Sequence, residues 1–100
     1  MARVIQPDGH QYILGMGESL VFNMNKLMQL VKGPIEVMEL DDNHALVFNA
    51  DLMIEADPES PNLNISAGNL LNRMFNMVMP VMGTVVLLDL DDALFMSKGL

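Results

Sequence analysis

The sequence contains no cysteine and no tryptophan, and aromatic residues make up only 5% of it. Without cysteine, the chain has no disulfide, no thiolate zinc site, no iron–sulfur cluster and no cysteine nucleophile. Small secreted domains usually depend on disulfides, so the composition favours a reducing cytoplasm. The apolar run at the N-terminus is too short for a signal peptide, which agrees with that expectation.

Basic residues are also scarce, because five Lys and Arg stand against thirteen Asp and Glu and give a net charge of −8. Affinity for nucleic acid comes mainly from neutralising phosphates, so this balance disfavours direct nucleic-acid binding. Long hydrophobic runs are missing as well. The longest stretch of low charge, residues 74–88, contains Pro80 and Gly83 and is shorter than the ~20 residues of a spanning helix. The sequence therefore predicts no membrane span.

Apolar residues are abundant, at 51% of the 100 residues. This content excludes intrinsic disorder, and the length allows one domain with one core. We therefore expect a single domain over residues 1–100, with residues 97–100 as a loose tail.

The first third of the chain predicts a hairpin followed by a helix. Residues 3–6 and 10–14 have strand character and flank an Asp8–Gly9 tight-turn signal. Ser19 is the expected N-cap of a helix over residues 18–32, which Gly33 and Pro34 end. Its apolar stripe consists of Leu20, Val21, Met24, Leu27, Met28 and Val31.

The rest of the chain predicts three strands and a second helix. Residues 35–40 alternate with their acids toward water, and residues 44–54 follow as a partner strand. Ser66 is the expected N-cap of a helix that reaches about Asn76. This helix should bury Leu70, Leu71, Met74 and Phe75.

Residues 84–90 are apolar on both faces, which is typical of a central strand. The sequence thus predicts one small α+β domain of order β-β-α-β-β-α-β. We expect a mixed or antiparallel sheet with two helices packed on it.

Several short motifs occur in order over residues 18–90. A helix ends at Val31-Lys32-Gly33, Ile35 and Glu36 open a strand, and Asn49, Asn64-Ile65-Ser66-Ala67 and Pro80-Val81-Met82-Gly83 follow. This series resembles a family known as domain of unknown function 3846, which is common in phages, plasmids and Gram-positive genomes. Lys32 and Pro34 depart from the family's usual glycine and aromatic. The resemblance implies a fold and a phage or mobile-element origin, and it implies no known reaction.

Acidic groups are the first candidates for chemistry. Asp89, Asp91 and Asp92 follow a strand, and Asp41, Asp42 and Asn43 form a turn, so both sets offer oxygen ligands to Mg²⁺ or Ca²⁺. Neither has the frame of an EF-hand loop, and Asp and Asn favour turns whatever the protein does. We therefore predict no metal site.

The sequence also gives little indication of a catalytic nucleophile or of a phosphate-binding loop. His10 and His44 lie beside predicted turns, and Ser19 lacks the second glycine of a nucleophile elbow. Residues 15–19 could seat a phosphate at a helix N-terminus, but Glu18 disfavours an anion there. No nucleoside-triphosphate or dinucleotide motif is present. The sequence predicts no catalytic or cofactor-binding residues and favours a non-enzymatic protein.

Methionine is the most unusual residue, with eleven copies. Methionine fills irregular gaps in cores and is over-used at surfaces that adapt to partners. A chain this small leaves part of its apolar surface unburied. We therefore expect a homo-oligomer whose interface contains Met74, Met77, Met79 and Met82.

Three functions stay open at this point. The first is a non-enzymatic binding protein of phage or mobile-element origin that acts by occupancy in the bacterial cytoplasm, for example in counter-defence. It would block a host protein or sequester a signalling nucleotide, which requires Arg3, Lys26 and Arg73 to converge across subunits. The second is an acidic inhibitor that imitates nucleic acid with the acids between Glu36 and Glu59. The third is a metal-dependent hydrolase that uses Asp89, Asp91 and Asp92.

Overall fold

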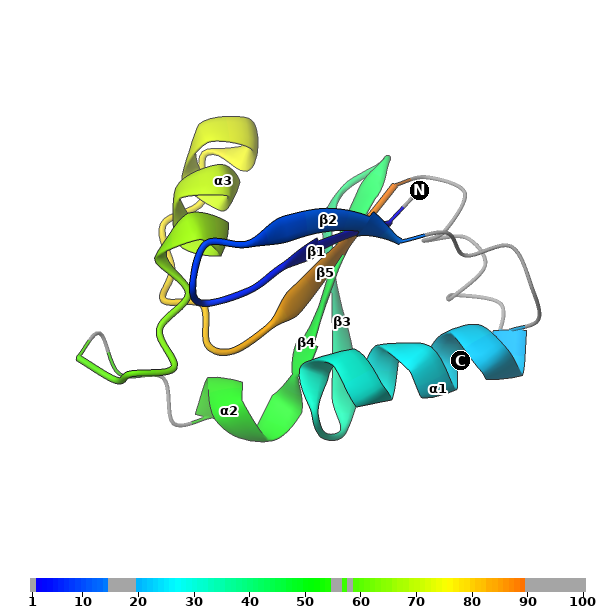
Figure 1. The fold of residues 1–100 in the computed structure, drawn as a ribbon. Coiled ribbons are helices and arrows are strands. Elements are labelled where there is room, and N and C mark those ends of the chain that lie inside the picture. Colours follow the sequence, from blue (N-terminus) through cyan, green and yellow to red (C-terminus); the bar gives the residue numbers. More distant parts are fainter. Residues whose placement is uncertain (1, 15–19, 55–56, 58, 90–100) are drawn as a thin grey trace.

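The structure is a computed structural model that describes residues 2–14, 20–54, 57 and 59–89. The predicted cap at Ser19, the candidate phosphate seat at residues 15–19 and the tail at residues 97–100 lie outside the described residues. The elements, in chain order, are β1 (Ala2–Ile5), β2 (Gln11–Leu14), α1 (Leu20–Val31), β3 (Ile35–Asp41), β4 (His44–Asn49), α2 (Ala50–Ile54), α3 (Ile65–Phe75) and β5 (Val85–Leu88). They form the predicted α+β domain (Figure 1).

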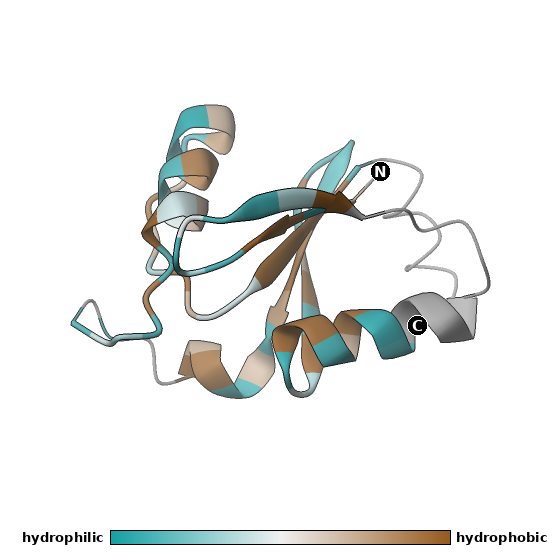
Figure 2. Ribbon diagram, in the orientation of Figure 1, coloured by the Kyte–Doolittle hydropathy of each residue, from teal (hydrophilic) through white to brown (hydrophobic). Residues whose placement is uncertain are grey.

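The five strands form one sheet of order β2-β1-β5-β4-β3, and every neighbouring pair is antiparallel. The apolar run near the C-terminus is its middle strand, as predicted, and all four residues of β5 are buried. The brown colour of β5 in Figure 2 marks this apolar centre. The two edges are β2 and β3, of which β3 is the longer.

The N-terminal hairpin is confirmed. Gly9 has a φ of 93°, a region that favours glycine, and its N–H donates to Gln6 O at 3.0 Å. The Asp8 side chain accepts from the His10 N–H at 2.8 Å. This turn brings residues 6–8 to one end of the sheet, where they line a cavity.

Helices cover both faces of the sheet, so the domain has three layers (Figure 1). On one face, Val4, Val47 and Val86 pack with Leu27 and Val31 of α1. On the other face, a second cluster joins the sheet to α3 and to the chain that follows it: Ile5, Leu46, Phe48, Ala67, Leu70, Leu71, Val81, Val85 and Leu87. Because successive residues of a strand point to opposite faces, β1, β3, β4 and β5 each contribute to both clusters.

The end of α1 differs from an ordinary glycine-terminated helix. Lys32 has the left-handed conformation, with a φ of 64°, and the N–H groups of Lys32 and Gly33 both donate to Met28 O. The predicted stop at Gly33 is confirmed. Its reason is contact, since a Cβ on Gly33 would lie 2.5 Å from Asn49 Nδ2.

The predicted strand over residues 44–54 is too long, because it ends at Asn49 and residues 50–54 form α2. Asn49 Oδ1 accepts from the N–H groups of Asp51 at 2.9 Å and Leu52 at 3.1 Å, so this buried side chain starts a helix. The described residues therefore contain three helices, in the order β-β-α-β-β-α-α-β.

The predicted cap of the next helix is two residues too late. Asn64, not Ser66, is the N-cap of α3, and its Oδ1 accepts from the Ala67 N–H at 3.0 Å. Asn64 is fully buried, and its Nδ2 donates to Ile5 O and Gly83 O. These two donations require strand β1 and the chain before β5, which explains why local sequence signals favoured Ser66.

Candidate functional site

Two adjoining cavities lie where the β1–β2 turn, the end of α1 and the chain before β5 meet. Their volumes are about 420 and 350 Å³, and Pro7, Lys32 and Thr84 line both. We call the pair the Lys32 cleft. Sites for small molecules usually measure roughly 300–1,000 Å³. Each half of the Lys32 cleft is therefore of a size that accepts a small ligand.

The polar lining of the Lys32 cleft is rich in amides. Gln6 and Gln29 line one half, Asn62 lines the other, and Thr84 adds a hydroxyl to both. Amides and hydroxyls donate and accept hydrogen bonds, whereas a lysine ammonium only donates. Lys32 is the one cationic side chain in this lining, and Asp8 is the one acidic side chain. The lining is therefore polar with one charge of each sign, and Lys32 is the group at which an anionic part of a ligand would bind.

The backbone of the Lys32 cleft is tightly fixed. Gly83 has a φ of 75°, and a Cβ there would lie 2.6 Å from Leu52 Cδ1. Asn49 Nδ2 donates to Val31 O at 3.0 Å and to Lys32 O at 3.2 Å, which ties the end of α1 to the start of α2. Lys32 thus stands on a fixed backbone while its side chain is exposed.

A smaller cavity of about 170 Å³ lies on the α3 side of the sheet, and we call it the Arg3 cavity. Arg3, Ile13, His44, Met74 and Asp89 line it, with two further apolar residues. It joins a predicted ligand residue, Arg3, to a predicted interface residue, Met74. Its volume is below the usual range of small-molecule sites, so it can hold a small group but not enclose a nucleotide.

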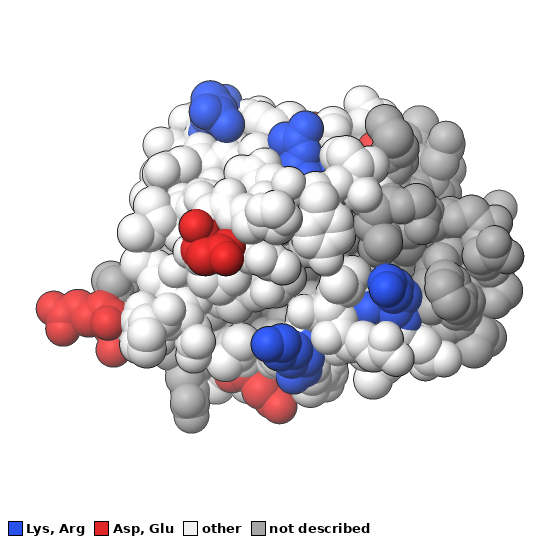
Figure 3. All heavy atoms as spheres, in the orientation of Figure 1, with Lys and Arg blue, Asp and Glu red and all other residues white. Residues whose placement is uncertain are grey.

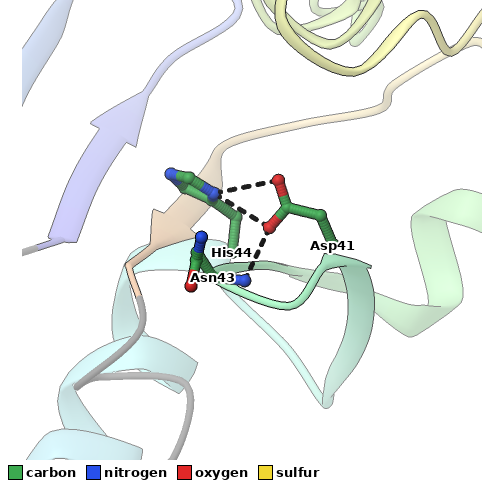
Figure 4. A network of polar contacts seen from close by, with 3 residues as sticks. All are labelled: Asp41, Asn43 and His44. Atoms are coloured by element: carbon green, nitrogen blue, oxygen red, sulfur yellow. Dashed lines mark hydrogen bonds and ion pairs between the residues drawn. The ribbon is translucent and has the colours of Figure 1, made fainter.

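His44 is oriented in this cavity by its neighbours (Figure 4). Its Nδ1 lies 3.0 Å from Asp41 Oδ1, and its ring meets the Phe75 ring edge-on with centroids 5.2 Å apart. The Asn43 N–H donates to Asp41 Oδ1 at 2.7 Å. This donation, opposed by partial desolvation and reinforced by His44, lowers the pKa of the Asp41 carboxyl. Asp41 is thus held in its charged form.

The three bases predicted to bind a ligand do not gather within one chain. Arg3 lines the cavity on the α3 side of the sheet, whereas Lys26 lies on α1, which covers the opposite face. Arg73 is exposed on α3 and does not line the Arg3 cavity. Sequence reasoning missed Lys32 as a site residue because the cleft joins segments near residues 7, 32 and 84.

The four methionines that the sequence predicted at an interface differ in how far they are buried. Met82 is only 2% exposed, and Met77 and Met79 pack against the core. Met74 is 49% exposed, although the sequence predicted that its helix would bury it. The most exposed apolar side chains in this region are Ile65 and Val78, at 63% and 89%.

Ile65 and Val78 border a groove of about 380 Å³ between α3 and the chain that follows it. Its lining includes Gly68, Asn72 and Met79, and we call it the α3 groove. Of the four methionines predicted at an interface, only Met79 lines it.

The acids of β3 face water, as predicted, and Glu36, Glu39 and Asp41 are exposed. A strand of seven residues is about 20 Å long, a length over which B-DNA carries about 12 charges. The far lower density on β3 disfavours imitation of duplex DNA by this strand.

Within the described part of the chain, no three His, Cys, Asp or Glu side chains are grouped so as to hold a metal ion. Asp91 and Asp92 of the predicted acidic cluster lie outside it. None of the helices it contains combines the length and hydropathy needed to cross a membrane.

Comparisons of the chain with models of protein families, with curated proteins and with solved structures found no match. The resemblance to domain of unknown function 3846 therefore stays a prediction.

Proposed function

We propose that this chain is a small non-enzymatic binding protein that acts by occupancy inside a bacterial host. Its ligand is a small phosphorylated molecule such as a signalling nucleotide, which it sequesters in the Lys32 cleft. The proposal keeps the phage or mobile-element origin that the family resemblance implies. The observation that carries it is the placement of Lys32, a left-handed lysine on the wall common to both cavities.

The conformation of Lys32 supports a role for its side chain. A residue with a Cβ in the left-handed region is less stable than glycine there by roughly 1–2 kcal/mol. Glycine is also the usual residue just after a helix. Strained backbone positions cluster at ligand sites, where the side chain is needed. The presence of lysine at this position therefore supports a role for its ammonium group.

Local interactions must provide the affinity, because a net charge of −8 repels anions at long range. That repulsion is screened beyond about 8 Å at physiological ionic strength. A hydrogen bond between an ammonium and a phosphate contributes about 1.5–3 kcal/mol, which is tenfold or more in affinity. The amides of Gln6, Gln29 and Asn62 add hydrogen bonds to the polar body of the ligand.

The test is isothermal titration calorimetry with a panel of cyclic mononucleotides and cyclic dinucleotides. We expect binding of at least one member, weakened about tenfold or more in Lys32→Gln. Lys26→Gln is the matched control, since it removes the same charge from a lysine on α1 that does not line the cleft. Absence of heat with every panel member, or equal weakening by both substitutions, would overturn the proposal.

A further inference from the structure

We infer that two copies of this chain associate through the α3 groove. The inference is independent of the Lys32 cleft, which shares no lining residue with the groove. It replaces the predicted methionine interface by a surface centred on Ile65, Gly68 and Val78.

Charge is unevenly distributed along the chain. Residues 62–88 contain no Asp or Glu and one base, Arg73. The chain has a net charge of −8, so this stretch carries +1 and the remaining residues carry −9. In Figure 3 most of the surface over α3 is white with one blue patch, and one red patch lies at its lower end, over the β1–β2 turn.

This uneven distribution of charge makes some contacts between two identical chains more favourable than others. Contact through β3 would bring Glu36, Glu39 and Asp41 of both copies together, and like charges side by side are unfavourable. The lining of the α3 groove lies within residues 62–88 and contains no acid. Contact through the groove therefore brings no acids of its lining together. A second copy therefore fits this surface better than it fits the β3 edge.

Apolar side chains are exposed at the border of the α3 groove. Val78 is 89% exposed and Ile65 is 63% exposed, and both border an apolar groove of about 380 Å³. In a dimer with two-fold symmetry, the same surface patch of each copy forms the interface. The exposed Val78 of each copy can then fill the groove of the other, and the water that contacts these side chains is released.

The test is sedimentation equilibrium of the full chain at micromolar concentration, with two disruptive variants. Val78→Asp places a carboxylate in the contact. We expect it to weaken the affinity between the two copies at least tenfold, so that the variant is a monomer. Ile65→Asp does the same at the first residue of α3, where an acid favours the helix dipole and so keeps the helix stable. Ile54→Asp is the matched control, because Ile54 is 81% exposed but lies on α2.

We expect the wild type and Ile54→Asp to be dimers and the other two variants to be monomers with unchanged circular dichroism. Added salt should tighten the dimer, because it screens the repulsion between the acidic remainders of the two copies. A monomeric wild type, or a dimer that survives both Val78→Asp and Ile65→Asp, would contradict the inference. So would a monomer that binds a different protein through Val78, because the occupant would then not be a second copy.

Discussion

Two buried asparagines, Asn49 and Asn64, join elements that are far apart in the sequence. Each uses its amide nitrogen to donate to two carbonyls and its oxygen to start a helix. Both belong to the short motifs that carry the family resemblance. Their hydrogen bonds give these motif positions a structural explanation, so the asparagines need no catalytic role.

At this scale, Asn64→Ala should be strongly destabilising. It removes the cap of α3, worth about 1 kcal/mol, and leaves the carbonyls of Ile5 and Gly83 without a donor in a buried site. We expect a loss of about 3 kcal/mol in the free energy of unfolding, measured by urea denaturation. Ser66→Ala, at the position that the sequence favoured, should change it by less than about 0.5 kcal/mol. Equal effects of the two substitutions would refute the assignment of the cap.

Asp41 makes a second prediction at the level of one residue, which concerns pH. Its pKa is lowered in the folded state, mainly by the Asn43 N–H and also by His44. A carboxyl with a lowered folded pKa stabilises the fold above its unfolded pKa, and this stability is lost as the pH falls through the folded pKa.

Wild-type stability should therefore fall more steeply than that of Asp41→Asn below about pH 4. Urea midpoints between neutral and acidic pH measure the difference between the two proteins. Parallel pH profiles would show that Asp41 does not contribute in this way.

At the scale of elements, one glycine inside a helix and one that follows a helix should respond to alanine in opposite directions. Gly68 is inside α3, and a Cβ there would make an ordinary contact, 3.7 Å from Met79 O. Gly68→Ala should add about 1 kcal/mol of stability from helix propensity, or roughly 4–8 °C in Tm. Gly33→Ala should remove about 2 kcal/mol, because its Cβ would displace the Asn49 amide. Thermal unfolding of both variants checks the pair, and a loss of stability in Gly68→Ala would contradict it.

Elements that depend on local signals were predictable from the sequence. The Asp8–Gly9 hairpin, the stop of α1 at Gly33 and the central strand β5 all follow from short patterns of turn residues and apolar residues. The helix after Asn49 and the cap at Asn64 were not predicted, because each depends on a buried side chain whose partners lie elsewhere in the fold. The burial of Met82 was missed for the same reason, since a methionine count does not show which copies face the core.

At the scale of the whole molecule, the candidate sites follow from packing that brings distant segments together. The Lys32 cleft needs the first hairpin, the end of α1 and the approach to β5, and no spacing in the sequence joins Pro7, Lys32 and Thr84. Charge distribution, in contrast, is visible in the sequence as the acid-free stretch over residues 62–88. The structure adds that this stretch contains both the α3 groove and the exposed Val78.

We propose that a lysine occupies the left-handed position 32 because its ammonium group binds the ligand. The most direct measurement compares Lys32→Gly with the wild type in urea unfolding and in calorimetry with the nucleotide that the wild type binds. Glycine relieves the backbone strain and removes the charge, so we predict stability higher by about 0.5–1 kcal/mol and affinity at least tenfold weaker. Unchanged affinity in the stabilised variant would show that the Lys32 ammonium group does not bind the ligand.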